Sequence, residues 1–182
     1  MKRAGRSRGL TLIELLTVIA IVAILAAVGV PGFRALLLHQ RLAAASQAFV
    51  AALGMARIEA IRRGEPVSVL AEGGAGWDAG WVVVADAGGD HAPRVLRRFD
   101  GLPPGIAVDR ELGGGLAQGV HYDGNGFSRR VRHAGFGAGC LAFRAETGRR
   151  AAIVLSASGR ARSCNPDRAG ECGTGVCGQG GG

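Results

Sequence analysis

An apolar run from Leu10 to Val30 constrains this chain more than any other feature of its sequence. The run holds 21 residues and a single charged side chain, Glu14. About 20 apolar residues form a helix long enough to cross roughly 30 Å of hydrocarbon, whereas the apolar region of a secretory signal is usually about 7–15 residues. The run therefore predicts a membrane-spanning helix. An acid inside such a helix is expected to have a function, because burying its charge is costly.

The residues at the start of the run form a motif. Gly9-Leu10-Thr11-Leu12-Ile13-Glu14 resembles the processing site of type IV prepilins and type II secretion pseudopilins, with Leu10 where most members have phenylalanine. The resemblance implies cleavage between Gly9 and Leu10 by a prepilin peptidase, N-methylation of Leu10, and assembly with other pilins or pseudopilins in a filament. It also implies that Glu14 pairs with the α-amine of a neighbouring subunit. The alternative is a plain signal anchor in which Glu14 has no role.

The leader predicts how the chain is oriented. Residues 1–9 carry four cations, in a chain of formal net charge +8. Cations beside a membrane helix remain in the cytoplasm. We therefore expect a single-pass inner-membrane protein with a periplasmic C-terminal domain.

The helix is expected to continue beyond the membrane to Arg63. Apolar residues recur there at steps of three and four, which predicts one buried stripe. This stripe consists of Leu38, Leu42, Ala45, Phe49, Leu53, Ala56 and Ala60. Pro31 is expected to kink or loosen the helix, while Gly64 and Pro66 end it.

Short β-rich runs separated by glycine and aspartate clusters follow the helix. They are residues 66–70, 80–85, 94–99, 106–108, 120–122, 126–129, 140–144, 151–155 and 160–164. The expected fold class is α+β and type IV pilin-like, with a long N-terminal helix packed on antiparallel β-sheet. The expected parts are a leader (1–9), the transmembrane half of the helix (10–30), its amphipathic half (31–64), a β-rich periplasmic domain (65–170) and a mobile glycine-rich tail (171–182).

Four cysteines lie on the exported side of the membrane helix: Cys140, Cys164, Cys172 and Cys177. In an oxidising periplasm an even set is expected to form disulfides. Of the possible pairings we favour Cys140–Cys164 with Cys172–Cys177. A zinc site is the rival interpretation, but no companion histidine stands nearby, so we expect no metal.

Later segments narrow the resemblance. Residues 56–67, 80–86, 94–99 and 153–162 are similar to the FimT and GspH group of minor pilins and pseudopilins. That group serves type II secretion pseudopili and type IV pili, and its FimT-like members bind DNA in naturally competent bacteria. The DNA-binding members carry a Gly-Arg-x-Arg motif, which Gly159-Arg160-Ala161-Arg162 matches here.

The distribution of charge along the sequence also favours the region around residues 159–162 as a DNA-binding surface. Residues 120–170 hold nine arginines and three acids, whereas residues 10–119 hold nine arginines and ten acids. On one strand Arg160 and Arg162 share a face, and Arg149 and Arg150 at the neighbouring turn are expected to extend it. Such a face would contact the phosphates of double-stranded DNA without reading sequence. The alternative is a solvated surface without a partner.

No catalytic or cofactor motif stands out. His39, His91, His121 and His133 lie outside any recognisable nucleophile or metal pattern, and residues 123–126 predict a turn rather than a calcium loop. We therefore expect no enzymatic activity and no cofactor. The favoured function is a minor pilin near the tip of a type IV filament that binds DNA for uptake. The alternatives are a minor pseudopilin H of type II secretion, and a membrane-anchored domain that never polymerises.

Overall fold

The structure is a computed structural model that describes residues 11–74, 76–85, 93–114, 116, 119–129, 137–173 and 177. The expected cleavage site between Gly9 and Leu10 lies outside these residues, as do His91 and His133. The chain divides into two compact units, residues 1–37 and 38–182.

One long helix, α1 (Leu12–Arg63), ends at the residue that the sequence predicts, while Leu10, where the apolar run begins, lies outside the described residues. At its start the Glu14 N–H donates to Thr11 Oγ1 at 3.3 Å, which is the bond expected of an N-cap threonine. At its end Arg63 lies in the last turn, where a cation suits the helix dipole, and Gly64 follows with φ 66°. The helix is continuous through Pro31. Loss of one backbone donor has therefore not divided it.

The first unit contains the apolar half of α1. Its large side chains are exposed, from 79% for Leu12 to 50% for Val30. Within the described part of the chain, α1 is the one helix long and apolar enough to cross a membrane. A continuous apolar surface of this kind marks a site that contacts lipid or other proteins.

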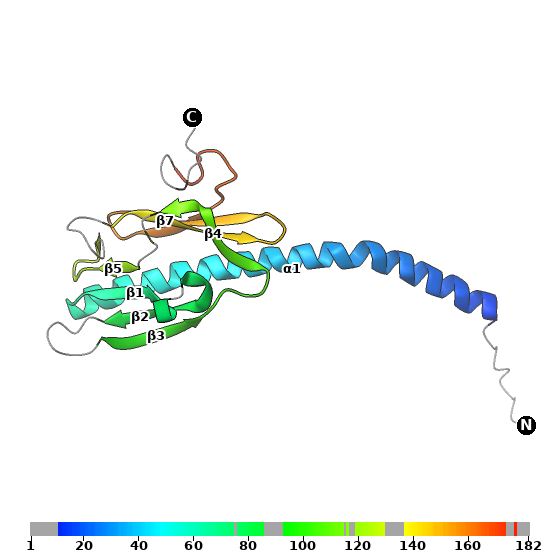
Figure 1. The fold of residues 1–182 in the computed structure, drawn as a ribbon, viewed down its shortest axis with the longest axis horizontal. Helices are drawn as coiled ribbons and strands as arrows, with labels where there is room; N and C mark the ends of the chain where they lie inside the picture. Colours follow the sequence, from blue (N-terminus) through cyan, green and yellow to red (C-terminus); the bar gives the residue numbers. More distant parts are fainter. Residues whose placement is uncertain are drawn as a thin grey trace, which may run out of the picture. The chain divides into compact units, whose positions relative to one another are not determined.

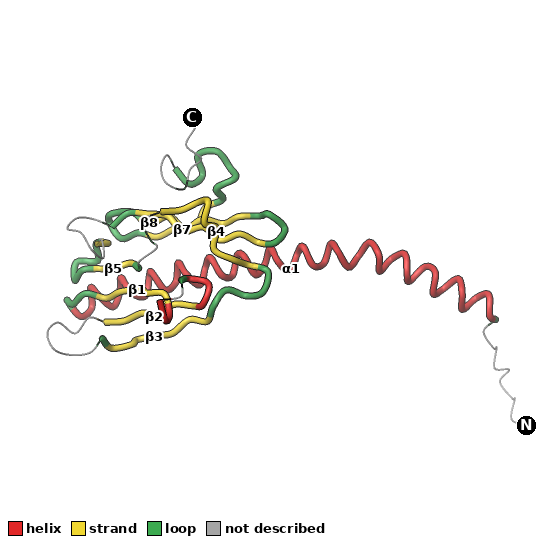
Figure 2. Tube along the Cα trace, in the orientation of Figure 1, coloured by secondary structure: helices red, strands yellow, loops and turns green. Residues whose placement is uncertain are grey.

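The second unit contains two antiparallel sheets (Figures 1 and 2). Sheet A has the order β3-β2-β1-β5-β6, and sheet B has the order β4-β7-β8-β9. The strands of sheet A are β1 (Val67–Ala71), β2 (Gly80–Ala85), β3 (Arg94–Asp100), β5 (Val120–Tyr122) and β6 (Ser128–Arg129). Those of sheet B are β4 (Ile106–Gly114), β7 (Gly139–Ala145), β8 (Arg150–Leu155) and β9 (Ala161–Cys164). Two short 3₁₀ helices, η1 (Glu72–Gly74) and η2 (Trp77–Ala79), connect β1 to β2.

The core forms where the buried stripe of α1 meets both sheets. Six of the seven residues in the predicted stripe are buried, and Leu38 is partly buried against them. Phe49, fully buried on α1, packs edge-on against Trp77 of η2, Trp81 of β2 and Phe143 of β7, with ring centroids 5.0, 5.2 and 6.0 Å apart. One helical side chain therefore joins the helix to sheet A and sheet B.

Strand β3 forms one edge of sheet A. Its side chains are mostly exposed, and they include Arg94, Arg97 and Arg98. The Arg97 guanidinium lies 4.9 Å from the centre of the Phe99 ring. The ladder between β2 and β3 shifts register between Val83 and Val84, so this edge is charged and irregular.

Candidate functional site

The Gly-Arg-x-Arg segment lies at the hairpin turn between β8 and β9. The Gly159 N–H donates to the carbonyl of Ser156 at 2.9 Å, and the Ser156 N–H donates to the carbonyl of Arg160 at 3.0 Å. Gly159 is buried and has φ 79°, a conformation that favours glycine. The glycine of the motif is therefore needed to form the turn.

A loop from sheet A supports this turn. Ser128 is fully buried; its N–H donates to the carbonyl of Ala157 at 3.3 Å, and its hydroxyl donates to that of Ser156 at 2.9 Å. Arg57 of α1 donates through Nε to the carbonyl of Gly126 at 3.0 Å. The turn is thus held by β6 and, through residue 126, by α1. These contacts join residues far apart in the sequence, which explains why sequence patterns did not identify Ser128 or Arg57 as supports.

The loop itself is the turn that the sequence predicts at residues 123–126. Asp123 Oδ1 accepts from the N–H groups of Asn125 and Phe127, each at 3.0 Å, and Oδ2 accepts from Arg129 at 2.7 Å. Partial burial alone would raise the pKa of Asp123, but these hydrogen bonds outweigh it and hold the pKa below its ordinary value. The Asp123 carboxylate therefore acts as a turn-stabilising group.

Arg160 and Arg162 lie together, as expected. Both line a pocket of about 280 Å³ with Val154, Ser156 and Ala161. Both are exposed, and neither has an acidic partner among the described residues. Arg162 Nη1 donates to the backbone carbonyl of Glu171 at 2.8 Å. A carbonyl carries no formal charge, so both arginines keep their positive charge available.

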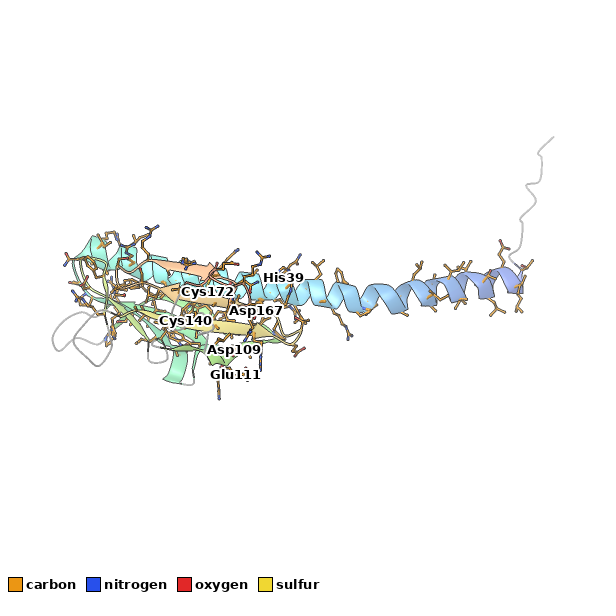
Figure 3. The ribbon with its side chains drawn as sticks, turned by 90° about the horizontal axis from the view of Figure 1, so that it is seen from above. His39, Asp109, Glu111, Cys140, Asp167 and Cys172 are labelled. Atoms are coloured by element: carbon orange, nitrogen blue, oxygen red, sulfur yellow. A yellow bond between two sulfur atoms is a disulfide. The ribbon has the colours of Figure 1, made fainter. Side chains whose placement is uncertain are left out.

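Arg149 and Arg150 lie at the opposite end of β8, which corrects the expectation that they extend the face of Arg160 and Arg162. Strand β8 has six residues, and at about 3.3 Å per residue it separates the two turns by roughly 20 Å. Arg150 is also paired with Asp167, its Nε 2.8 Å from Oδ1, and this hydrogen bond raises the pKa of Arg150. Both arginines line a second pocket, of about 530 Å³, together with His39 of α1 and Asp167. Figure 3 labels His39 and Asp167.

The four cysteines form two disulfides, but not in the expected pairing. The bonds join Cys140 to Cys177 and Cys164 to Cys172. Cys140 is on β7 and Cys164 is on β9, and β8 lies between these strands. Two strand spacings amount to about 9.5 Å, which is beyond the about 7 Å that a disulfide can span between Cα atoms. The strand order therefore excludes Cys140–Cys164.

The last segment is partly described. Cys172 and Cys177 are buried, whereas the remaining residues after 173 lie outside the described part of the chain. The expectation of a mobile tail over 171–182 is thus untested for most of its length, while residues 171–173 connect to sheet B through Arg162 and the Cys164–Cys172 bond.

Comparison with known proteins agrees with this architecture. Residues 45–159 match the model of the type II transport protein GspH family, and residues 5–30 match the prokaryotic N-terminal methylation motif. Among curated protein sequences no significant match is found.

Two solved structures have a similar fold. The type IV minor pilin FimU of Pseudomonas aeruginosa is 21% identical, with a TM-score of 0.55 over 74% of this chain and 96% of that one. The minor pseudopilin EpsH of the Vibrio cholerae type 2 secretion system is 15% identical, with a TM-score of 0.52 over 70% of this chain and 99% of that one. The family model, the methylation motif and the shared pilin fold together show that the chain belongs to the GspH family of minor pilins and pseudopilins.

Proposed function

We propose that this minor pilin sits near the tip of a type IV filament and binds duplex DNA without sequence preference through Arg160 and Arg162. One observation carries the proposal: both arginines are exposed and line a single pocket, without an acidic partner among the described residues. Elsewhere on sheet B, Arg150 is neutralised by Asp167, and Arg144 lies 3.9 Å from Glu111. Arg149 also lacks an acidic partner among the described residues, and we propose it as a separate phosphate contact.

The chemistry of the pocket suits a phosphate backbone. A guanidinium presents five donors in a planar fork that matches phosphate oxygens. Contacts of this kind add affinity without sequence information. Each neutralised phosphate contributes about −0.9 to the slope of log affinity against log salt concentration. Arg160 and Arg162 together should therefore contribute about −1.8.

The test is a salt series of duplex-DNA binding by the full chain in non-ionic detergent. The double variant Arg160→Ala/Arg162→Ala should weaken binding and make the slope shallower by about 2. Arg94→Ala/Arg97→Ala, on β3 of sheet A, is the matched control because it removes the same charge from two arginines that also have no acidic partner among the described residues. Equal binding by wild type and the pocket variant would refute the proposal, as would equal weakening by both variants.

The second candidate is a minor pseudopilin H that acts in type II secretion without binding DNA. The family match to a type II transport protein and the fold of EpsH favour it. Under this alternative the arginine pocket is solvated surface, and the wild-type chain would show no salt-dependent DNA binding.

We also propose how the chain is processed and placed in the membrane before it assembles. Prepilin peptidase cleaves between Gly9 and Leu10, Leu10 is N-methylated, and the chain enters the inner membrane with residues 65–170 in the periplasm. Glu14 then pairs with the α-amine of the neighbouring subunit. Two observations support an intersubunit role: the Glu14 side chain is exposed, and its carboxylate has no ion-pair partner in the part of the chain that is described.

A further inference from the structure

The loop after β9 is closed by the Cys164–Cys172 disulfide, whose Cα atoms are 5.3 Å apart. The Asn165 N–H donates to Glu171 Oε1 at 3.0 Å, the Asp167 N–H donates to Asn165 Oδ1 at 2.9 Å, and the Glu171 N–H donates to the carbonyl of Arg168 at 3.2 Å. Residues 164–172 therefore form a disulfide-closed ring, stabilised by hydrogen bonds within it, that begins at the last residue of β9.

This ring holds Arg162. The Arg162 guanidinium donates to the carbonyl of Glu171, one residue before Cys172. The carboxylate of the same glutamate is directed elsewhere, to the Asn165 N–H and toward Arg168 at 3.9 Å. Arg162 is therefore oriented by a neutral oxygen that uses one of its five donors. Among the described residues no hydrogen bond is formed by the other four.

The orientation has an energetic consequence. A free arginine side chain samples many rotamers, and part of this conformational entropy is lost whenever the group must adopt one geometry on a ligand. A side chain held in place beforehand has less of this entropy to lose on binding. The disulfide keeps the carbonyl of residue 171 within reach of Arg162, although nine positions separate the two in sequence.

We propose that the disulfide-closed loop, residues 164–172, positions Arg162 for phosphate contact, so that DNA binding depends on the Cys164–Cys172 bond. This inference rests on the proposed DNA-binding function. The loop adds no phosphate contact of its own in this scheme. It sets the geometry of a contact that Arg162 makes.

The experiment compares two disulfide variants of the full chain in non-ionic detergent. Cys164→Ser/Cys172→Ser opens the loop without changing any charge. Cys140→Ser/Cys177→Ser is the matched control, because it removes a disulfide of the same buried cysteine cluster but leaves the 164–172 ring closed. Unfolding followed by tryptophan fluorescence establishes that each variant is folded, and binding to a duplex oligonucleotide is then measured across a salt series.

The expected result has two parts. Opening the loop should make the salt slope shallower by up to about 0.9, the contribution of one phosphate contact, while the control keeps the wild-type slope. Adding Arg162→Ala to the open-loop variant should then cause less loss than it does in the wild type, because the two changes act on the same contact.

Two results would overturn the inference. The first is a wild-type slope and affinity in the open-loop variant, and the second is equal weakening by both disulfide variants. If wild type binds DNA and only Arg160→Ala/Arg162→Ala weakens it, the inference fails while the proposed function stands. If wild type shows no binding at any salt concentration, both fail together.

Discussion

Replacing Gly159 by alanine tests whether the arginine-bearing turn is held by packing as well as by its own backbone. An L-residue in the left-handed conformation costs about 1–2 kcal/mol. A Cβ at position 159 would also collide with the carbonyl oxygen of Gly126 and lie 3.0 Å from the ring of Tyr122. Because the opposing oxygen belongs to the backbone, the turn must move, and overpacking of this kind costs about 1–3 kcal/mol. The total expected loss of stability is about 2–5 kcal/mol.

The hairpin between β7 and β8 supplies the matched control. Gly148 closes it with an N–H to carbonyl bond of 2.8 Å to Ala145, like the 2.9 Å bond of Gly159 to Ser156. Its φ is 83°, but nothing lies within 4 Å of a Cβ built there. Gly148→Ala should therefore lose only the conformational cost of about 1–2 kcal/mol.

The assay is denaturant unfolding of the full chain in non-ionic detergent, followed by tryptophan fluorescence. The chain has two tryptophans, Trp77 and Trp81, and both are buried in the core of the second unit. The difference between the two variants measures the packing contribution directly. Equal losses of stability in Gly148→Ala and Gly159→Ala would refute the reasoning, because packing against the loop at Gly126 would then add nothing to the stability of the turn.

Two further predictions concern single groups. Burial raises the pKa of the Tyr122 hydroxyl despite the nearby Arg57, so the folded chain should keep its only tyrosine protonated where an unfolded one ionises, at about pH 10. The free energy of unfolding should therefore be independent of Tyr122 ionisation below that pH and should fall as the pH rises above it. Tyrosinate absorbance near pH 10 in the folded state would contradict this prediction. Glu14→Ala and Glu14→Gln should reduce recovery of the chain in sheared filaments by more than tenfold, since an unpaired buried charge costs about 3–5 kcal/mol, whereas Glu14→Asp should retain much of it. Unchanged recovery in the two neutral variants would exclude the proposed ion pair.

Local patterns predicted most of the elements. The three- and four-residue spacing of apolar side chains identified the buried face of α1, because a helix turns once every 3.6 residues. The β-rich runs 140–144 and 151–155 were also predicted, and they correspond to the neighbouring strands β7 and β8.

Features that depend on strand order were not predictable in the same way. The division into two sheets depends on which strands become neighbours, and no local pattern encodes that. The favoured Cys140–Cys164 pairing was wrong because β8 lies between the two cysteine-bearing strands. Within the candidate site, the proximity of Arg160 and Arg162 follows from their spacing, but the separation from Arg149 required knowledge of which end of β8 each turn occupies.

The exposed edge strand of sheet A, β3, has features that disfavour aggregation by strand pairing. An open strand edge can template pairing with another copy, which leads to aggregates. Along β3, a second copy adding as a strand would bring Arg94 and Arg97 close to the same cations of its partner. The register shift beside Val83 also disturbs the regular ladder that such pairing needs. Strand-to-strand growth is therefore disfavoured at this edge. A subunit whose open edge resists such pairing remains available for the ordered assembly with other pilins that its family implies.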